Sequence, residues 1–210
     1  MIYLIGGSPR CGKTKVAKAL TQKTHIPWFP ADYLGAVAFQ YISQENYAEK
    51  FPLSNIHDQD PTNDYLYSNY SAEQIVGFYY TQADTIWAGL KAFIKYAAHD
   101  EQDFVIEGYH INPNLLAQLD EQTKKSIRAV FIYKEDEENI VEGLKKNVDP
   151  GDWLLKNTHQ DSTFPKVAEM IRAFGERTRR EAESAQMRAF NMDGDFERKI
   201  EEVVKGLLDK

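Results

Sequence analysis

The stretch that decides the fold lies at residues 7–14 and reads GSPRCGKT. Its spacing is G-x-x-x-x-G-K-[ST], with Gly7, Gly12, Lys13 and Thr14 at the fixed positions. In this pattern the backbone N–H groups of a tight loop surround a phosphate chain, the lysine reaches the terminal phosphates, and the hydroxyl binds Mg²⁺. Glycine is required because such a loop visits positive φ and approaches its ligand closely. The sequence therefore predicts a phosphate-binding loop.

The residues on either side of this motif support that interpretation. The apolar run IYLI at 2–5 predicts a strand before the loop, and KTKVAKALTQKT at 13–24 predicts a helix after it. The positive end of that helix would point at the same phosphates. The alternative, a glycine turn that binds nothing, leaves this strand–loop–helix context unexplained. We expect the loop to contact a nucleotide through Gly7, Ser8, Arg10, Cys11, Gly12, Lys13 and Thr14.

Composition bounds the class of protein. The chain has 210 residues, of which 42% are hydrophobic, and we expect a single domain over 1–210. A net charge of −7 argues against broad binding to nucleic acid or anionic membranes. No apolar run approaches the ~20 residues of a membrane span, and MIYLIGGS lacks a basic leader. One cysteine excludes an internal disulfide, so we expect a cytoplasmic protein.

Short apolar runs alternate with longer helical patterns along the chain, which is typical of a parallel α/β sheet. The expected strands lie at 2–5, 26–29, 104–107, 129–133 and 187–192. The expected helices lie at 13–23, 32–43, 71–98, 113–122, 136–146, 166–185 and 195–208.

Two segments interrupt this alternation. Residues 44–70 are rich in Asn, Asp, Pro and Tyr, and residues 147–165 contain a Pro-Gly break and a short helical piece around WLLK. Long insertions in compact domains commonly form binding loops or lids. We interpret 44–70 as a flap on the substrate side and 147–165 as a lid.

Acidic residues follow two of the predicted strands. FVIEG at 104–108 ends on Glu107, which could hold Mg²⁺ beside the phosphate loop; the alternative is a carboxylate that merely ends a strand at the surface. Asp32, after the second strand, could accept the proton of a substrate hydroxyl that attacks the γ-phosphate. It could equally be the N-cap of a helix that begins at Tyr33, and the sequence leaves both roles open.

Other polar residues are weaker candidates. His110, just beyond Glu107, could contact the substrate, although lone histidines are more often structural. In RAFGERTRREAES at 172–184, pairs of opposite charge at i,i+4 predict a solvated, ion-paired helix face. We nevertheless expect at least one arginine to reach the nucleotide, with Arg172 and Arg177, nearest the lid, as the candidates.

Cys11 lies inside the loop, close to Lys13 and to the start of the predicted helix. Such a setting lowers the pKa of a thiol. The sequence therefore predicts a reactive Cys11 that ATP and Mg²⁺ protect from alkylation.

Taken together, GGSPRCGKT, Asp32, VIEGYH, a lid and an arginine-bearing helix resemble the small-molecule kinases of the phosphate-loop class. FVIEGYHINP, and the run from TFPKVAEMIRAFGERTRREAE to NMDGDFERKIEEVV, are similar to segments of 2-phosphoglycerate-kinase-like proteins. The resemblance implies a three-layer α/β P-loop NTPase fold, with a five-stranded parallel sheet in the order 2-3-1-4-5 and a helical lid. It also implies ATP and Mg²⁺ as cofactors, Lys13 and Thr14 on the phosphates and metal, and Asp32 as the base.

The implied reaction is transfer of the γ-phosphate to a hydroxyl of a small molecule. The acceptor stays unidentified, because Asp58, Asp60 and Asp64 in segment 44–70 would be an unusual lining for an anionic substrate. KKNVD at 145–149 lacks the order of the N-K-x-D signature, which argues against a GTPase. The alternative of another class is a nucleotide-binding regulatory protein, or weak ATPase, that switches a protein partner.

Overall fold

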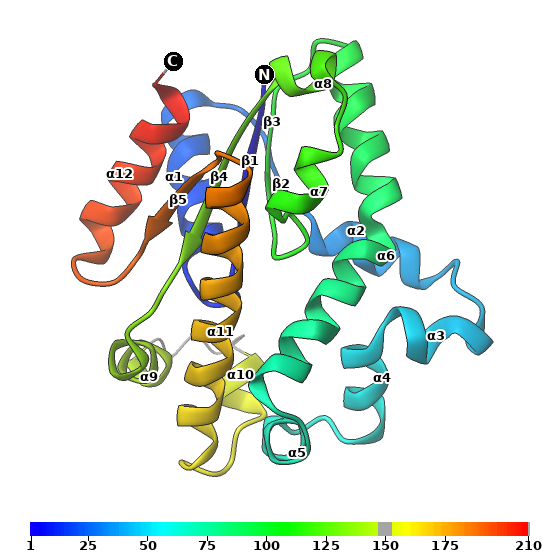
Figure 1. The fold of residues 1–210 in the computed structure, drawn as a ribbon, viewed down its shortest axis with the longest axis vertical. Helices are drawn as coiled ribbons and strands as arrows, with labels where there is room; N and C mark the ends of the chain where they lie inside the picture. The colour runs from blue at the N-terminus through cyan, green and yellow to red at the C-terminus, as the bar shows by residue number, and fades with distance from the viewer. Residues whose placement is uncertain (147–152, 210) are drawn as a thin grey trace.

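Five parallel strands form one sheet at the centre of the protein (Figure 1). In the computed structural model, which describes residues 1–146 and 153–209, their order is β2-β3-β1-β4-β5. This confirms the predicted five-stranded parallel sheet in the order 2-3-1-4-5. The strands are β1 (Ile2–Gly7), β2 (Trp28–Pro30), β3 (Phe104–Glu107), β4 (Ile127–Tyr133) and β5 (Arg188–Asn191).

Helices cover both faces of the sheet. Side chains alternate along a strand, so Tyr3 and Ile5 of β1 join the core under α1 (Lys13–Thr24) and α12 (Phe196–Leu208). Their neighbours Ile2 and Leu4 join the core on the opposite face. The helices there are α6 (Ala72–His99), α7 (Pro113–Ala117) and the C-terminal end of α11 (Thr163–Ser184). Burial on both faces explains why these strands are continuous apolar runs.

The two long helices, α6 and α11, extend well beyond the sheet (Figure 1). Ser71 and Gln74 form a capping box that starts α6. The N-terminal halves of α6 and α11 pack together with four short helices in what we call the helical lobe. Those four helices are α3 (Gln44–Lys50), α4 (Pro52–Gln59), α5 (Asn63–Asn69) and α10 (Trp153–Lys156).

Segment 44–70 is helical, which the sequence analysis did not predict. Its Asn, Asp and Pro residues act at helix ends: Pro52 stands in the first turn of α4, and the Thr62 side chain accepts the N–H of Tyr65 in α5. Leu53 and Ile56 are one helical turn apart, and both are buried. Polar residues thus mark helix starts and ends in this segment, which was not among the expected helices.

Other boundaries differ by a few residues. The helix expected at 113–122 is two short helices, α7 and α8 (Glu121–Lys125), because Asn112 caps the first and Asp120 caps the second. Helix α2 (Asp32–Phe39) ends earlier than expected, and α9 (Glu137–Lys146) begins one residue late. The short helical piece at WLLK is confirmed as α10, whereas residues 147–152 of the expected lid lie outside the described residues. Within the described residues, no helix combines the length and apolarity needed to cross a bilayer.

Candidate active site

The loop between β1 and α1 has no room for side chains at its two glycines. Gly7 has a φ of 130°, and a Cβ there would lie 1.9 Å from the carbonyl oxygen of Ile132 on β4. Gly12 has a φ of 100°, and a Cβ would lie 2.5 Å from Cζ of Phe196. Only glycine fits both the backbone conformation and the space. This is the close-packed, left-handed loop that the motif predicts.

Lys13 begins α1 and turns its side chain back into this loop. The residue is 8% exposed, and Nζ donates a hydrogen bond of 2.7 Å to the carbonyl oxygen of Ser8. The first N–H groups of a helix have no partner within the helix, and its dipole is positive at this end. An ammonium and helical N–H groups therefore meet at one point, which suits a phosphate chain.

Thr14 and Glu107 lie together beside the loop. The Thr14 hydroxyl donates a hydrogen bond of 3.0 Å to Oε1 of Glu107, and the register of β1 and β3 pairs Glu107 with Ile5. Burial raises the pKa of Glu107, while Lys13 and the Thr14 hydrogen bond oppose that rise. A hydroxyl and a carboxylate are the oxygen ligands that Mg²⁺ takes from proteins when phosphates and water complete its shell. The two residues fit a Mg²⁺ ion, although among the described residues no group of three or more acidic, His or Cys side chains forms a complete site.

Asp32 is not a helix N-cap. Ala31 occupies that position, and no side chain caps α2. Asp32 is instead the first residue of the helix. It stands two positions after Pro30, which the strand register of β2 and β3 pairs with Glu107. Its carboxylate lines the same cavity as Lys13. The Asp32 side chain is 64% exposed, but partial desolvation at the cavity wall raises its pKa and outweighs the opposing effect of Lys13.

His110 is buried behind this carboxylate. Its Nδ1 lies 3.6 Å from Oδ1 of Asp32, which is too long for a hydrogen bond. Burial, reinforced by Lys13, lowers the pKa of His110 to about 3, so the imidazole is neutral at pH 7. His110 lines an adjoining cavity of about 360 Å³ that shares Asp32 and Tyr109 with the main one. Its contact with a substrate stays a prediction.

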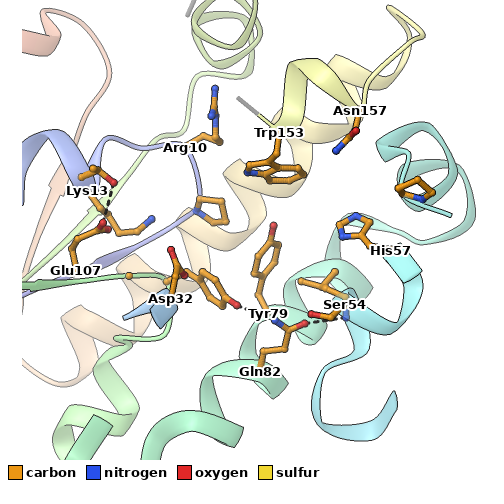
Figure 2. Close-up of a pocket in the computed structure, with 16 residues that line it drawn as sticks. Arg10, Lys13, Asp32, Ser54, His57, Tyr79, Gln82, Glu107, Trp153 and Asn157 are labelled. Atoms are coloured by element: carbon orange, nitrogen blue, oxygen red, sulfur yellow. Dashed lines mark hydrogen bonds between the residues drawn. The ribbon is translucent and has the colours of Figure 1, made fainter. Parts of the chain in front are cut away.

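The main cavity has a volume of about 580 Å³ and runs from the phosphate loop to the helical lobe. Figure 2 shows Lys13, Glu107 and Asp32 at one end, and His57, Trp153 and Asn157 at the other. The polar and aromatic residues that line it are Arg10, Lys13, Thr14, Asp32, Ser54, His57, Tyr79, Gln82, Glu107, Tyr109, Trp153 and Asn157.

The sequence analysis did not predict most of the residues that line the cavity away from the phosphate loop, which we call the far wall. Ser54 and His57 come from α4, Tyr79 and Gln82 from α6, and Trp153 from α10. None of them belongs to a motif. The one available signal was that α4 and α10 fall within the two segments, 44–70 and 147–165, predicted to cover the substrate.

The acidic residues of segment 44–70 do not line the cavity, contrary to our expectation. Asp58 accepts a hydrogen bond of 2.7 Å from the Tyr47 hydroxyl, and Asp60 accepts from Thr62. Asp64 is buried and bonded to the segment after α10. Their carboxylates serve helix ends and packing, so they say nothing about the charge of a substrate.

Arg172 and Arg177 also lie elsewhere. Arg172 pairs with Glu137 at 2.6 Å and with Glu176 at 3.5 Å. Arg177 pairs with Glu181 at 2.9 Å, and its guanidinium stacks 3.5 Å from the centroid of the Tyr80 ring. Neither lines the cavity. The predicted ion-paired helix face is confirmed, and contact of either arginine with a nucleotide stays a prediction.

The expectation of a reactive Cys11 is wrong. The side chain is fully buried in the core, and Sγ lies 2.6 Å from Oγ of Ser8. Burial raises the pKa of the thiol, which outweighs the lowering effects of Ser8, Lys13 and Lys134. Proximity to a helix start and a lysine lowers a thiol pKa only when the sulfur faces them with access to water.

We therefore predict that Cys11 reacts slowly with iodoacetamide in the native protein, at the same rate with and without ATP and Mg²⁺. Addition of denaturant should release fast labelling, because unfolding exposes the sulfur. Mass spectrometry of the intact protein over time would measure both rates. Fast native labelling that nucleotide slows would show that Cys11 faces the loop.

Asp64, in α5, forms hydrogen bonds to the segment that follows α10. Oδ2 accepts the N–H of His159 at 2.8 Å, and Oδ1 accepts the N–H of Gln160 at 3.3 Å and the hydroxyl of Thr163. Burial acts to raise the pKa of Asp64, but these hydrogen bonds outweigh it and hold the pKa below its ordinary value. The carboxylate thus joins α5 to the connection between α10 and α11.

Asn63, the neighbouring residue, makes a second set of bonds to α10. Its amide donates to the carbonyl of Leu154 and the hydroxyl of Thr158, both at 3.1 Å. Its backbone N–H donates to the carbonyl of Asn157 at 2.8 Å. Asn63 and Asp64 therefore hold α10, and with it the cavity residues Trp153 and Asn157, against α5.

Asp64→Asn should lower the free energy of unfolding by about 1–3 kcal/mol, because an amide cannot accept from three donors and leaves buried groups unpaired. The melting temperature should fall by roughly 3–10 °C, and hydrogen exchange should quicken in 153–163. The folded pKa is lowered, so the stabilisation is present above the ordinary pKa and disappears as pH falls through the lowered one. The difference between wild type and D64N should therefore narrow in acid.

Asp161→Asn is the matched control, since that side chain lies in the same segment and is 90% exposed. It should change the melting temperature by no more than about 2 °C. Equal effects of the two substitutions would contradict a specific role for Asp64.

Comparison with known proteins identifies the fold. No known family model and no curated protein matches the sequence. A gluconokinase from Sinorhizobium meliloti 1021 is similar in structure, with a TM-score of 0.52 and 15% identity over 98% of this chain and 90% of that chain. A shikimate kinase from Bacteroides thetaiotaomicron has a TM-score of 0.50 and 14% identity over 98% and 97%. A sugar kinase from Janibacter sp. HTCC2649 has a TM-score of 0.50 and 12% identity over 98% of this chain and 93% of that chain. The chain has the P-loop kinase fold.

Proposed function

We propose that this protein transfers the γ-phosphate of ATP, with Mg²⁺, to a hydroxyl of a small molecule. The observation that carries the proposal is one cavity that holds Lys13, the Thr14–Glu107 pair and Asp32 at the same end. Phosphoryl transfer needs a cation on the phosphates, oxygen ligands for a metal, and a base near the attacking hydroxyl. The cavity residues would supply all three.

Lys13 would bind the β- and γ-phosphates. Its ammonium is buried and held by the Ser8 carbonyl at 2.7 Å, so it needs little rearrangement to meet a phosphate oxygen. Thr14 and Glu107 would hold the Mg²⁺ ion, which neutralises charge on the phosphate oxygens when it is bound. Preorganised charge of this kind stabilises the transition state more than the ground state.

Asp32 would accept the proton of the acceptor hydroxyl. Its carboxylate faces the cavity, and its raised pKa brings it closer to the operating pH, which favours general-base catalysis. The helical lobe would close over the acceptor and exclude water, which limits transfer of the phosphate to water.

A regulatory protein or weak ATPase remains the alternative from another class. The size and lining of the cavity support the kinase, since a nucleotide switch needs no walled volume of about 580 Å³ beside its phosphate loop. Membership of the 2-phosphoglycerate-kinase-like group and a cytoplasmic location stay predictions of the sequence.

The first test is Lys13→Met, which removes the charge and keeps most of the volume. Acceptor-dependent ADP release should fall at least about a hundredfold, because the cation that follows the transferred charge is lost. Lys23→Ala, at an exposed position of the same helix, is the control and should retain full activity. A folded K13M protein with undiminished phosphoryl transfer would overturn the proposal.

The second test is Asp32→Asn. Turnover should fall by about 10²–10⁴-fold, toward the lower end because phosphoryl transfer depends heavily on positioning. The base must be deprotonated, and burial raises its pKa, so wild-type activity should decline on the acid side at a pH above the ordinary range of aspartate. D32N should lack this acid limb.

The melting temperature of D32N should stay close to that of wild type, because the Asp32 side chain makes no cap hydrogen bond. ATP affinity should also be nearly unchanged. An unaltered pH profile and unaltered turnover would assign the proton transfer to another group.

A further inference from the structure

We propose that the acceptor is an uncharged, hydroxylated compound with a ring, and that it carries neither a carboxylate nor a phosphate. This inference rests on the proposed function and deepens it by naming the class of acceptor. It follows from which charges line the cavity, and where they lie.

Two cationic side chains line the described part of the cavity, Arg10 and Lys13, and both belong to the phosphate loop. Lys13 is held inside that loop by Ser8, and Figure 2 shows the Arg10 side chain pointing away from Lys13. Phosphates of the nucleotide would use these charges. Among the lining residues that the structure describes, no other cation would pair with an acid on the acceptor.

The residues that precede α10 in the sequence add no cation to the described lining of the cavity. Residues 147–152 read NVDPGD, which contains two acids and no Lys or Arg. Lys145 pairs with Asp161 at 3.3 Å and Lys146 with Glu142, and neither lysine lines the cavity. An acceptor carboxylate or phosphate would have to enter the cavity without an ion pair, which is costly.

The far wall is polar but neutral. It presents the hydroxyl of Ser54, the amide of Asn157 and the imidazole of His57. The Nε2 atom of His57 is buried, with no hydrogen-bond partner among the described residues. Burial lowers the pKa of His57 in spite of Asp58 and Asp60, which keeps the imidazole neutral. Neutral donors and acceptors of this kind match hydroxyl groups.

An aromatic surface completes the wall. The Trp153 ring lies edge-on to His57, with centroids 6.2 Å apart, and Pro61 lines the cavity with them. Trp153 is 41% exposed although it is a large aromatic residue. Asn63 donates to the Leu154 carbonyl and so holds α10 against α5, and the Trp153 ring on this helix forms a surface of the cavity. A flat apolar face of a ring compound would cover it.

The experiment compares neutral acceptors with charged analogues that have the same carbon skeleton and most of the same hydroxyl groups. One set is glucose, gluconate and glucosamine; another is ribose, ribose 5-phosphate and ribonate; a third is adenosine and AMP. Each is incubated with the protein, ATP and Mg²⁺, and the readouts are ADP release and the mass of the phosphorylated product. We expect a neutral member to have kcat/KM at least about tenfold above its anionic partner.

The second arm tests the aromatic surface with the best neutral acceptor. Trp153→Ala should raise the acceptor KM roughly three- to tenfold, more than it lowers kcat, and leave the KM for ATP unchanged. Trp153→Phe should restore most of the lost affinity. Tyr96→Ala is the control, because Tyr96 is 72% exposed near the C-terminal end of α6, away from the helical lobe.

The outcomes separate this inference from the proposed function. Preference for a carboxylated, phosphorylated or amino acceptor would overturn the inference and leave the kinase proposal intact. An unchanged acceptor KM in W153A would overturn the role of the aromatic surface. If no acceptor of any class is phosphorylated, and K13M hydrolyses ATP as wild type does, both proposals fail.

Discussion

The contact between Gly7 and the carbonyl of Ile132 fixes the geometry on which the rest of the site depends. Because a Cβ at Gly7 would lie 1.9 Å from that oxygen, the end of β1 can lie flat against β4 only with glycine. The chain then turns at once, with Arg10 and Gly12 at positive φ, and starts α1 at Lys13. Sheet packing thus aims both the helix start and the Lys13 ammonium at one point. Packing of β1 against β4 in the core therefore determines the geometry of the phosphate loop.

The site also requires that the helical lobe keeps its position relative to the phosphate loop. The lobe contributes Ser54 and His57 from α4, Gln82 from α6 and Trp153 from α10 to one cavity. The α6 helix runs from the sheet face into the lobe and carries Gln82, which donates to the Tyr109 hydroxyl at 2.9 Å and accepts the N–H of Leu53 at 3.0 Å. One side chain therefore connects the β3 end of the site to α4. Asp64 then joins the neighbouring α5 to the segment that follows α10.

How much the sequence could predict depended on whether a residue's role was local. The loop, the strand that precedes it and the position of Glu107 follow from short patterns, since each strand end lies at the same edge of a parallel sheet. The far wall comes from helices distant in sequence, whose side chains share no spacing. Asp32 shows the limit at one residue: a helix that begins there instead of at Tyr33 changes a cap into a free carboxylate. Cys11 shows that side-chain orientation is also hard to predict, because sequence neighbours do not reveal whether a side chain faces the loop or the core.

Lys13 also affects the pKa of the groups around it, in second place after burial. Burial raises the pKa of both Asp32 and Glu107, and the Lys13 ammonium opposes that rise in each case. On His110 the two effects act in the same direction, since burial and a neighbouring cation both disfavour the imidazolium. A single buried cation therefore favours ionised carboxylates and a neutral imidazole within one small volume. Among the described lining residues, charge is concentrated at the phosphate-loop end of the cavity. The other described lining residues are neutral, and under our proposal they would recognise an acceptor by its hydroxyls and its shape.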